Sequence, residues 1–168
     1  MSSITKQYVN VAVSDGTSMQ LYMAKPDSKE SMPGILVFQE AFGVNTHIRD
    51  VTARIAAEGY IAVAPELFHR SAEPGFEGSY TDFQSVMPHT KALTPEGLEA
   101  DIRAAYDQLV KTENVLPDKI AAIGFCMGGR VSFMASAMLP LRSAAFFYGS
   151  GIENLLGTAG DISCPLLL

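Results

Sequence analysis

The chain has 168 residues, 48% of them hydrophobic, which is enough for one folded domain with a sizeable core. Lysine and arginine number 12 against 18 aspartates and glutamates, so the net charge is −6 and no basic run is available to bind nucleic acid or an anionic membrane. Two cysteines are too few for a disulfide scaffold, no apolar stretch is long enough to span a bilayer, and the N-terminus has no apolar signal core, so we expect a cytoplasmic protein.

The N-terminal part of the chain is predicted to hold four strands and one helix. The first two strands flank Ser14-Asp15-Gly16-Thr17, a sequence typical of a hairpin turn. The other two strands are continuous apolar runs, as expected for central parallel strands that are covered on both faces. A helix with one apolar face lies between these two runs and ends at Gly59. In chain order the predicted strands are 8–13, 18–24, 34–38 and 60–64.

The middle of the chain combines an irregular segment with a well-marked helix. Residues 66–93 are rich in Gly, Pro, Ser and aromatic residues, which indicates loop and short helix over the edge of an active site. Thr94 as a cap and Pro95 in the first turn then predict a helix start. An apolar stripe from Leu98 to Leu109 gives that helix one buried face.

A cysteine lies at the junction of the next strand and helix. Residues 119–123 read as a buried strand, and the apolar spacing after Cys126 predicts a helix. The sequence between them, Gly124-Phe125-Cys126-Met127-Gly128, has the Gly-x-Cys-x-Gly spacing of a nucleophile elbow, with sulfur in place of the usual oxygen. Glycine is needed on both sides because larger side chains would collide with the neighbouring strand and helix. A buried structural cysteine beside a Gly-rich strand end is the alternative interpretation.

The position of this cysteine suits a nucleophile chemically. A helix N-terminus favours a thiolate, and its first free N–H groups can receive a developing oxyanion. The backbone N–H of Met127 is the first such donor. We therefore expect Cys126 to be an activated thiol, in contrast to Cys164, which precedes a later strand at the opposite edge of the sheet.

The order of the elements predicts an α/β fold. Two more strands follow the cysteine, at 144–148 and from residue 165 onward. Strands that alternate with amphipathic helices indicate a mostly parallel sheet with helices on both faces, preceded here by the N-terminal hairpin. Ligands in such sheets bind beyond the carboxyl ends of the strands, where Cys126, the loop at Glu40 and the loop at Glu66 all fall.

Three motifs occur in the same order and sheet position as in a known family. They are Gln39-Glu40-Ala41-Phe42-Gly43-Val44-Asn45, Ala64-Pro65-Glu66-Leu67-Phe68 and Gly124-Phe125-Cys126-Met127-Gly128-Gly129. From about Gly34 to the last residue, the chain resembles the dienelactone hydrolase family of α/β-hydrolases. The resemblance implies a Cys-His-Asp triad that hydrolyses a lactone or other small ester through an acyl-cysteine intermediate, with no metal or organic cofactor.

The resemblance also implies a role for individual residues. Cys126 matches the nucleophile, and Glu40 matches the glutamate that lies against the resting thiol and assists its deprotonation. The backbone N–H groups of Ala41 and Met127 match the two oxyanion donors. The negative charge of Glu40 would by itself disfavour a thiolate, and a solvated loop glutamate is the alternative interpretation of this residue.

The sequence departs from the family pattern in its acid–base residues. It ends at Leu168, before the positions at which the family's aspartate and histidine would follow, so we interpret residues 1–168 as one incomplete α/β-hydrolase domain of a longer protein. His47 and His69 fall near the carboxyl edge of the sheet, and His89 lies in the irregular segment, but each is more typical of a polar surface residue. The alternative is an inactive family member that acts only by binding or association, for which an open sheet edge would favour a homodimer.

The residues expected to bind the substrate also depart from the family pattern. The family binds a substrate carboxylate with arginines, one of them from the segment that corresponds to residues 72–93, and this chain has none there. Arg70 is the nearest candidate, although a surface arginine that covers an apolar loop is the more ordinary interpretation. We expect Arg70, Tyr80 and Phe42 to contact a small-molecule ester or lactone, which need not carry a carboxylate.

Overall fold

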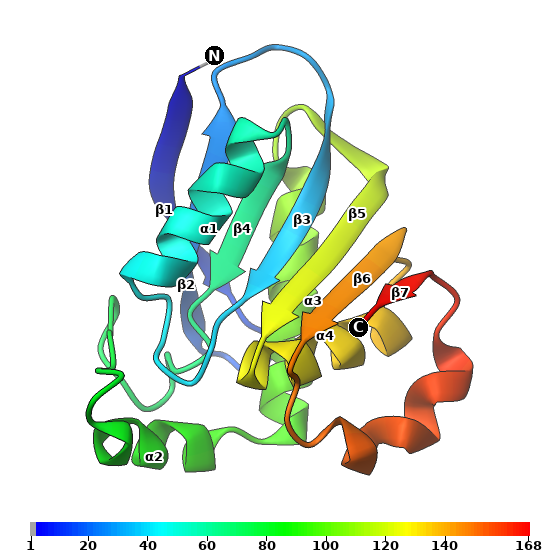
Figure 1. Cartoon of the computed structure of the whole chain (residues 1–168). Coiled ribbons are helices and arrows are strands. Elements are labelled where there is room, and N and C mark those ends of the chain that lie inside the picture. The colour runs from blue at the N-terminus through cyan, green and yellow to red at the C-terminus, as the bar shows by residue number, and fades with distance from the viewer. Residues whose placement is uncertain (1–2) are drawn as a thin grey trace.

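The computed structural model describes residues 3–168 and shows a seven-stranded mixed sheet with helices on both faces (Figure 1). The strand order across the sheet is β1-β2-β4-β3-β5-β6-β7, in which β1, β2 and β4 are antiparallel neighbours and the remaining pairs are parallel. This arrangement confirms the predicted α/β class. The strands are β1 (Ile4–Ala12), β2 (Ser18–Pro26), β3 (Met32–Phe38), β4 (Ile61–Pro65), β5 (Val115–Phe125), β6 (Ser143–Phe147) and β7 (Leu166–Leu167).

The predicted N-terminal hairpin is confirmed and extends further toward the N-terminus. Its pairing runs from Ile4 opposite Pro26 to Ala12 opposite Ser18. Asp15 closes the turn by accepting hydrogen bonds from both the N–H and the hydroxyl of Thr17, and Gly16 takes the left-handed conformation with φ 88°.

Two of the helices begin directly after residues whose side chains cap them. Asn45 accepts a hydrogen bond from the Ile48 N–H at 3.1 Å, and Thr94, as predicted, accepts one from the Gly97 N–H at 3.1 Å. None of the helices within residues 3–168 is both long and apolar enough to cross a bilayer. The α-helices are α1 (Thr46–Ala57), α2 (Phe83–Ala92), α3 (Pro95–Lys111) and α4 (Met127–Met138).

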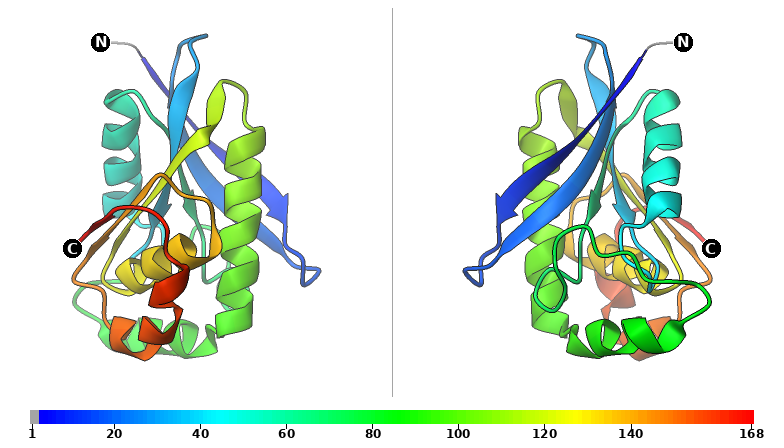
Figure 2. Two further views of the ribbon diagram at one scale, coloured as in Figure 1. Left: turned by 90° about the vertical axis from the view of Figure 1, so that its right-hand side faces the viewer. Right: turned by 90° about the vertical axis from the view of Figure 1, so that its left-hand side faces the viewer.

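The helices are divided unequally between the two faces of the sheet (Figure 2). Helices α3 and α4 cover one face, and α1 covers the other over β2 and β4. Successive residues of a strand point to opposite faces, so Leu36 and Phe38 pack with the core beneath α3 and α4, whereas Val37 packs with the core beneath α1.

Two elements differ from the sequence-based expectations. β5 begins at Val115, four residues before the predicted strand, and a register shift between Pro33 and Gly34 accommodates the extra length beside β3. The segment between β6 and β7 was expected to be a loop, but it contains the 3-10 helix η1 (Ile152–Asp161), which packs against α4. The signal for this helix was present in the sequence, since Ile152, Leu155, Leu156 and Ala159 follow helical spacing, although none of its residues is buried.

Candidate active site

Cys126 connects β5 to α4 in a strained backbone conformation. Its φ of 53° and ψ of −121° lie in a region that L-residues rarely occupy. The two flanking glycines permit this turn, because a Cβ at Gly124 would overlap the carbonyl of Gly128 and a Cβ at Gly128 would overlap the carbonyls of Phe38 and Gln39. The sequence pattern Gly-x-Cys-x-Gly thus corresponds to close backbone packing between β5, α4 and the end of β3.

The thiol of Cys126 forms no disulfide. The Cys126 N–H donates to the Phe147 carbonyl at 3.0 Å, which anchors the turn to β6. Within residues 3–168 the sulfur makes no hydrogen bond, and the side chain is half-buried at the N-terminus of α4.

Two backbone N–H groups lie unpaired beside this turn. Neither the Ala41 N–H nor the Met127 N–H donates a hydrogen bond within the part of the chain that the structure describes. Both residues are buried, and the contact of Gly128 with Phe38 and Gln39 brings the start of α4 against the loop that carries Ala41. Unpaired buried N–H groups are rare in folded proteins, so this pair is available to an external acceptor such as an oxyanion.

Glu40 is held by two tyrosines. The Tyr80 hydroxyl donates to Glu40 Oε2 at 2.6 Å, and the Tyr148 hydroxyl donates to Oε1 at 3.4 Å. Asn45 in turn donates to the Tyr80 oxygen at 3.2 Å. Burial and the nearby Glu40 carboxylate raise the pKa of both phenols, which therefore remain protonated donors at neutral pH. Tyr148 is also close enough to Cys126 to interact with it electrostatically.

Aromatic rings surround the outer side of this carboxylate. The Phe42 ring packs against Tyr80 with a centroid separation of 4.4 Å and against Phe83 at 6.1 Å. Tyr80 and Tyr148 are 57% and 68% exposed, so their rings face solvent as well as Glu40. The predicted residues Glu40, Phe42 and Tyr80 therefore lie together at one side of the sheet's carboxyl edge.

Arg70 is placed elsewhere. Its guanidinium donates to Asp15 Oδ2 at 2.7 Å and to both oxygens of the buried Asp101 carboxylate at 2.8 and 2.9 Å. These ion pairs direct Arg70 toward the hairpin turn and α3, and they leave it outside the group formed by Glu40, the tyrosines and Cys126. Arg70 is therefore not a candidate for contact with a substrate at Cys126.

The three histidines lie at separate places. His69 is buried and makes a 3.0 Å contact from Nε2 to Asp101, while its Nδ1 has no partner within the described residues. His89 Nδ1 lies 3.0 Å from the Ser71 hydroxyl, and His47 is exposed in the first turn of α1. Among residues 3–168 no histidine hydrogen-bonds to Cys126, and no group of three His, Cys, Asp or Glu side chains forms a metal site.

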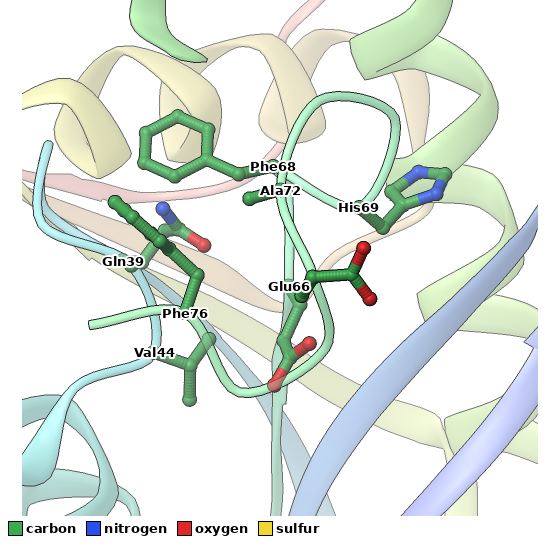
Figure 3. Close-up of a pocket in the computed structure, with 9 residues that line it drawn as sticks. Gln39, Val44, Glu66, Phe68, His69, Ala72 and Phe76 are labelled. Carbon is green, nitrogen blue, oxygen red and sulfur yellow. The ribbon is translucent and has the colours of Figure 1, made fainter. Parts of the chain in front are cut away.

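A small cavity of about 10 Å³ lies between His69 and the loop after β3 (Figure 3). Its wall includes Gln39, Glu66 and Phe76. The volume matches a single water molecule rather than a substrate. The Glu66 carboxylate accepts the Gly75 N–H, and its burial raises its pKa above the ordinary value.

A larger apolar groove opens on the other face of the sheet. It has a volume of about 550 Å³ between α1 and the strands β5 and β6. Phe125 and Phe147 stack at 5.5 Å on its floor, and Tyr148 lies at its end. Tyr148 is thus shared by the groove and by the hydrogen bond to Glu40.

Two residues of this region were missed by the sequence analysis. Gln39 is fully buried, with its amide bonded to the Glu40 carbonyl and to the Leu67 N–H. A polar residue directly after the apolar run 34–38 was the available signal for it. The signal for Tyr148 was its place after β6, at the same sheet edge as Cys126.

Comparison with known proteins settles the family. The family model described as the dienelactone hydrolase family matches residues 19–168. The chain belongs to the dienelactone hydrolase family. The predicted resemblance is confirmed, and with it the α/β-hydrolase type of the sheet.

Individual members of the family show the same likeness over a limited length. A protein of Synechocystis sp. (strain PCC 6803) named "Putative carboxymethylenebutenolidase" is 38% identical over 148 residues, which are 79% of this chain and 54% of that protein. A protein of the same name from Escherichia coli K12 is 31% identical over 92% of this chain and 59% of its own length. The chain thus spans little more than half the length of these curated relatives.

Solved structures of the family superpose closely on the chain. The structure named m3DLH has a TM-score of 0.81 and 28% identity, and it covers 97% of this chain and 67% of that one. The dienelactone hydrolase-like promiscuous phosphotriesterase P91, from metagenomic libraries, also has a TM-score of 0.81, with 26% identity over 98% of this chain and 67% of that one.

Proposed function

We propose that this chain carries the nucleophile and the oxyanion-binding groups of a Cys-dependent hydrolase that acts on a small carboxylic ester or lactone. The observation that carries the proposal is the turn at Cys126, whose sulfur has no hydrogen-bond partner within residues 3–168 and lies next to the unpaired N–H groups of Ala41 and Met127. A structural cysteine would need neither the positive φ nor the open donors.

In the proposed reaction Glu40 accepts the thiol proton as the Cys126 sulfur attacks the carbonyl carbon of the ester. The carbonyl oxygen becomes an oxyanion and accepts hydrogen bonds from the two N–H groups. The carbon–oxygen bond to the alcohol then breaks, the alcohol takes the proton from Glu40, and a thioester remains on Cys126. Water hydrolyses this thioester to the carboxylic acid and restores the thiol.

The last step requires a general base near the thioester. The family resemblance implies a histidine oriented by an aspartate for this role, and no histidine within residues 3–168 contacts Cys126. We therefore expect acylation of Cys126 to be separable from turnover in this chain.

We further propose that the substrate is uncharged. Both described hydrogen bonds to the Glu40 carboxylate come from phenols. Arg70, the candidate cation, is paired with Asp15 and Asp101 instead. A carboxylate without a cationic partner repels an anionic substrate.

The cytoplasmic location and the homodimer remain predictions from the sequence.

The test is release of aryl alcohol from p-nitrophenyl acetate, with the protein mass followed for an acetyl adduct. We expect an adduct that maps to Cys126 and is absent from the Cys126→Ala variant, and the Cys164→Ala variant serves as a matched control because burial raises the pKa of the Cys164 thiol. A single burst would mean that the deacylating base is absent, whereas sustained turnover would mean that the chain supplies one. The absence of any adduct would contradict the proposed nucleophile and favour a family member that acts only by binding.

A further inference from the structure

We propose that Gln39 is a positioning residue that orients the peptide between Glu40 and Ala41, so that the Ala41 N–H points at the oxyanion. This inference rests on the proposed function. The Gln39 side chain is 0% exposed and bridges two backbone groups. Its Nε2 donates to the Glu40 carbonyl at 3.2 Å, and its Oε1 accepts the Leu67 N–H at 3.0 Å. Figure 3 shows the Gln39 side chain at the wall of the small cavity between His69 and the loop after β3.

The planarity of the peptide bond connects this contact to the oxyanion donor. The Glu40 carbonyl and the Ala41 N–H belong to one peptide unit, which is trans, as are all the described peptide bonds. In a trans peptide the C=O and the N–H point in opposite directions within one plane. A donor that holds the carbonyl from the Gln39 side therefore holds the N–H toward the opposite side.

No other contact within residues 3–168 performs this task. The Glu40 carbonyl accepts only the hydrogen bond from Gln39, and the Ala41 N–H donates none. The loop is next held at Phe42, whose carbonyl accepts the Gly78 N–H at 2.9 Å, and at Gly43, which packs against the Phe76 carbonyl. Neither contact involves the peptide between Glu40 and Ala41. Without Gln39 the peptide could rotate about its two Cα atoms and turn the N–H away.

The second hydrogen bond of Gln39 fixes the amide itself. Leu67 lies two residues beyond β4, which pairs with β3, so this hydrogen bond holds the Gln39 side chain against the sheet. Donation to a peptide carbonyl also polarises the peptide and strengthens its N–H as a donor. Both effects strengthen the hydrogen bond that the Ala41 N–H donates to an oxyanion.

The test compares two reactions of the same sulfur. Acetylation of Cys126 by p-nitrophenyl acetate passes through an oxyanion, whereas alkylation by iodoacetamide does not. Both reactions depend on the thiolate, so the ratio of their rates reports the oxyanion donors alone. In the Gln39→Met variant, which preserves side-chain length but removes both hydrogen bonds, we expect acetylation to fall about tenfold or more while alkylation changes little.

The Gln39→Glu variant provides a second readout that a purely structural role would not change. The introduced carboxyl can still accept the Leu67 N–H, but it donates to the Glu40 carbonyl only when it is protonated. We expect the ratio of acetylation to alkylation to be low at alkaline pH and to rise as the pH falls, whereas the ratio for the original chain stays level. Thr52→Val is the matched control, because it removes a buried hydrogen bond from α1 at a distance from Cys126, and its ratio should equal that of the original chain.

The outcomes separate the two proposals. If Cys126 is acetylated and the Gln39 variants have an unchanged ratio, or lose acetylation and alkylation equally, the role of Gln39 is overturned and the proposed function stands. If Cys126 of the original chain is alkylated but never acetylated, the proposed function fails and the role of Gln39 fails with it.

Discussion

The Glu40 carboxylate is surrounded by phenolic donors, and this environment acts on the phenols in return. Ionisation of Tyr80 or Tyr148 would place a phenolate beside a carboxylate, which adds to the effect of burial and raises the pKa of both. The interaction is therefore measurable from the tyrosine side, without any substrate.

In the Glu40→Gln variant we expect the pKa values of Tyr80 and Tyr148 to move down, though not to the ordinary value, because burial is the larger cause and persists. The absorbance of tyrosinate between pH 8 and 12 measures this directly, since the chain has six tyrosines and no tryptophan. Glu58→Gln, on the exposed end of α1, is the control. Identical titration curves for Glu40→Gln and the original chain would contradict the hydrogen-bond assignment.

Because of Glu66, we expect the folded state to lose stability as the pH rises. Burial raises its pKa from an ordinary value of 4.5, so the folded chain holds this proton to a higher pH than the unfolded chain does. Its contribution to stability is then fully present below the unfolded pKa and is lost as the pH rises through the folded pKa. Near neutral pH the buried charge costs free energy.

We expect Glu66→Gln to raise the urea midpoint relative to the original chain at pH 7, and to raise it less or not at all at pH 4. The variant keeps an acceptor for the Gly75 N–H while it removes the charge. Urea unfolding at the two pH values is the measurement. The same difference at both pH values would show that the carboxyl does not titrate as its burial implies.

At the scale of elements, the turn between β5 and α4 depends on the absence of side chains at Gly124 and Gly128. The Gly128→Ala methyl would overlap the carbonyls of Phe38 and Gln39, and neither backbone group can move without displacing β3. We expect this substitution to lower the free energy of unfolding by at least about 3 kcal/mol. Gly157→Ala, where a methyl meets nothing within 4 Å, should change it by no more than about 0.5 kcal/mol. Chemical denaturation of both variants tests the contrast, and equal losses would refute it.

The elements differed in how well they could be predicted. Apolar runs predicted β3 and β4, and the Thr94-Pro95 pair predicted the start of α3, because these signals are local. The early start of β5 was not predictable, since it depends on pairing with β3, whereas η1 was missed although its apolar residues have helical spacing. The candidate site divides in the same way: the elbow spacing indicated Cys126, whereas the contacts of Gln39 depend on Leu67, which is 28 residues away.

At the scale of the whole molecule, one charged network ties three separate segments together. Arg70, in the loop after β4, bridges Asp15 in the hairpin turn and Asp101 in α3, and Asp101 also contacts His69. Asp101 is fully buried, and its contacts with Arg70 and His69 offset the cost of removing the carboxylate from water. The network was invisible in the sequence because its members are spread over 87 positions, from 15 to 101, within no motif.

We expect Asp101→Asn to lower the free energy of unfolding by about 3 kcal/mol, because it leaves the Arg70 charge without its principal partner. Glu99→Gln removes an exposed ion pair with Arg103 on the same helix and should cost no more than about 0.5 kcal/mol. Thermal or urea unfolding compares the two. If Asp101→Asn were as stable as Glu99→Gln, the network would have no structural importance.

The apolar groove between α1 and the strands β5 and β6 has a practical consequence for enzymology. Tyr148 lines this groove and also donates to Glu40. An apolar molecule bound in the groove beside Tyr148 would therefore contact a residue of the candidate site. Nonionic detergents, hydrophobic dyes and long-chain aryl esters all carry groups that such a groove accommodates. We therefore expect the rate of acetylation of Cys126 to differ with and without detergent in the assay buffer.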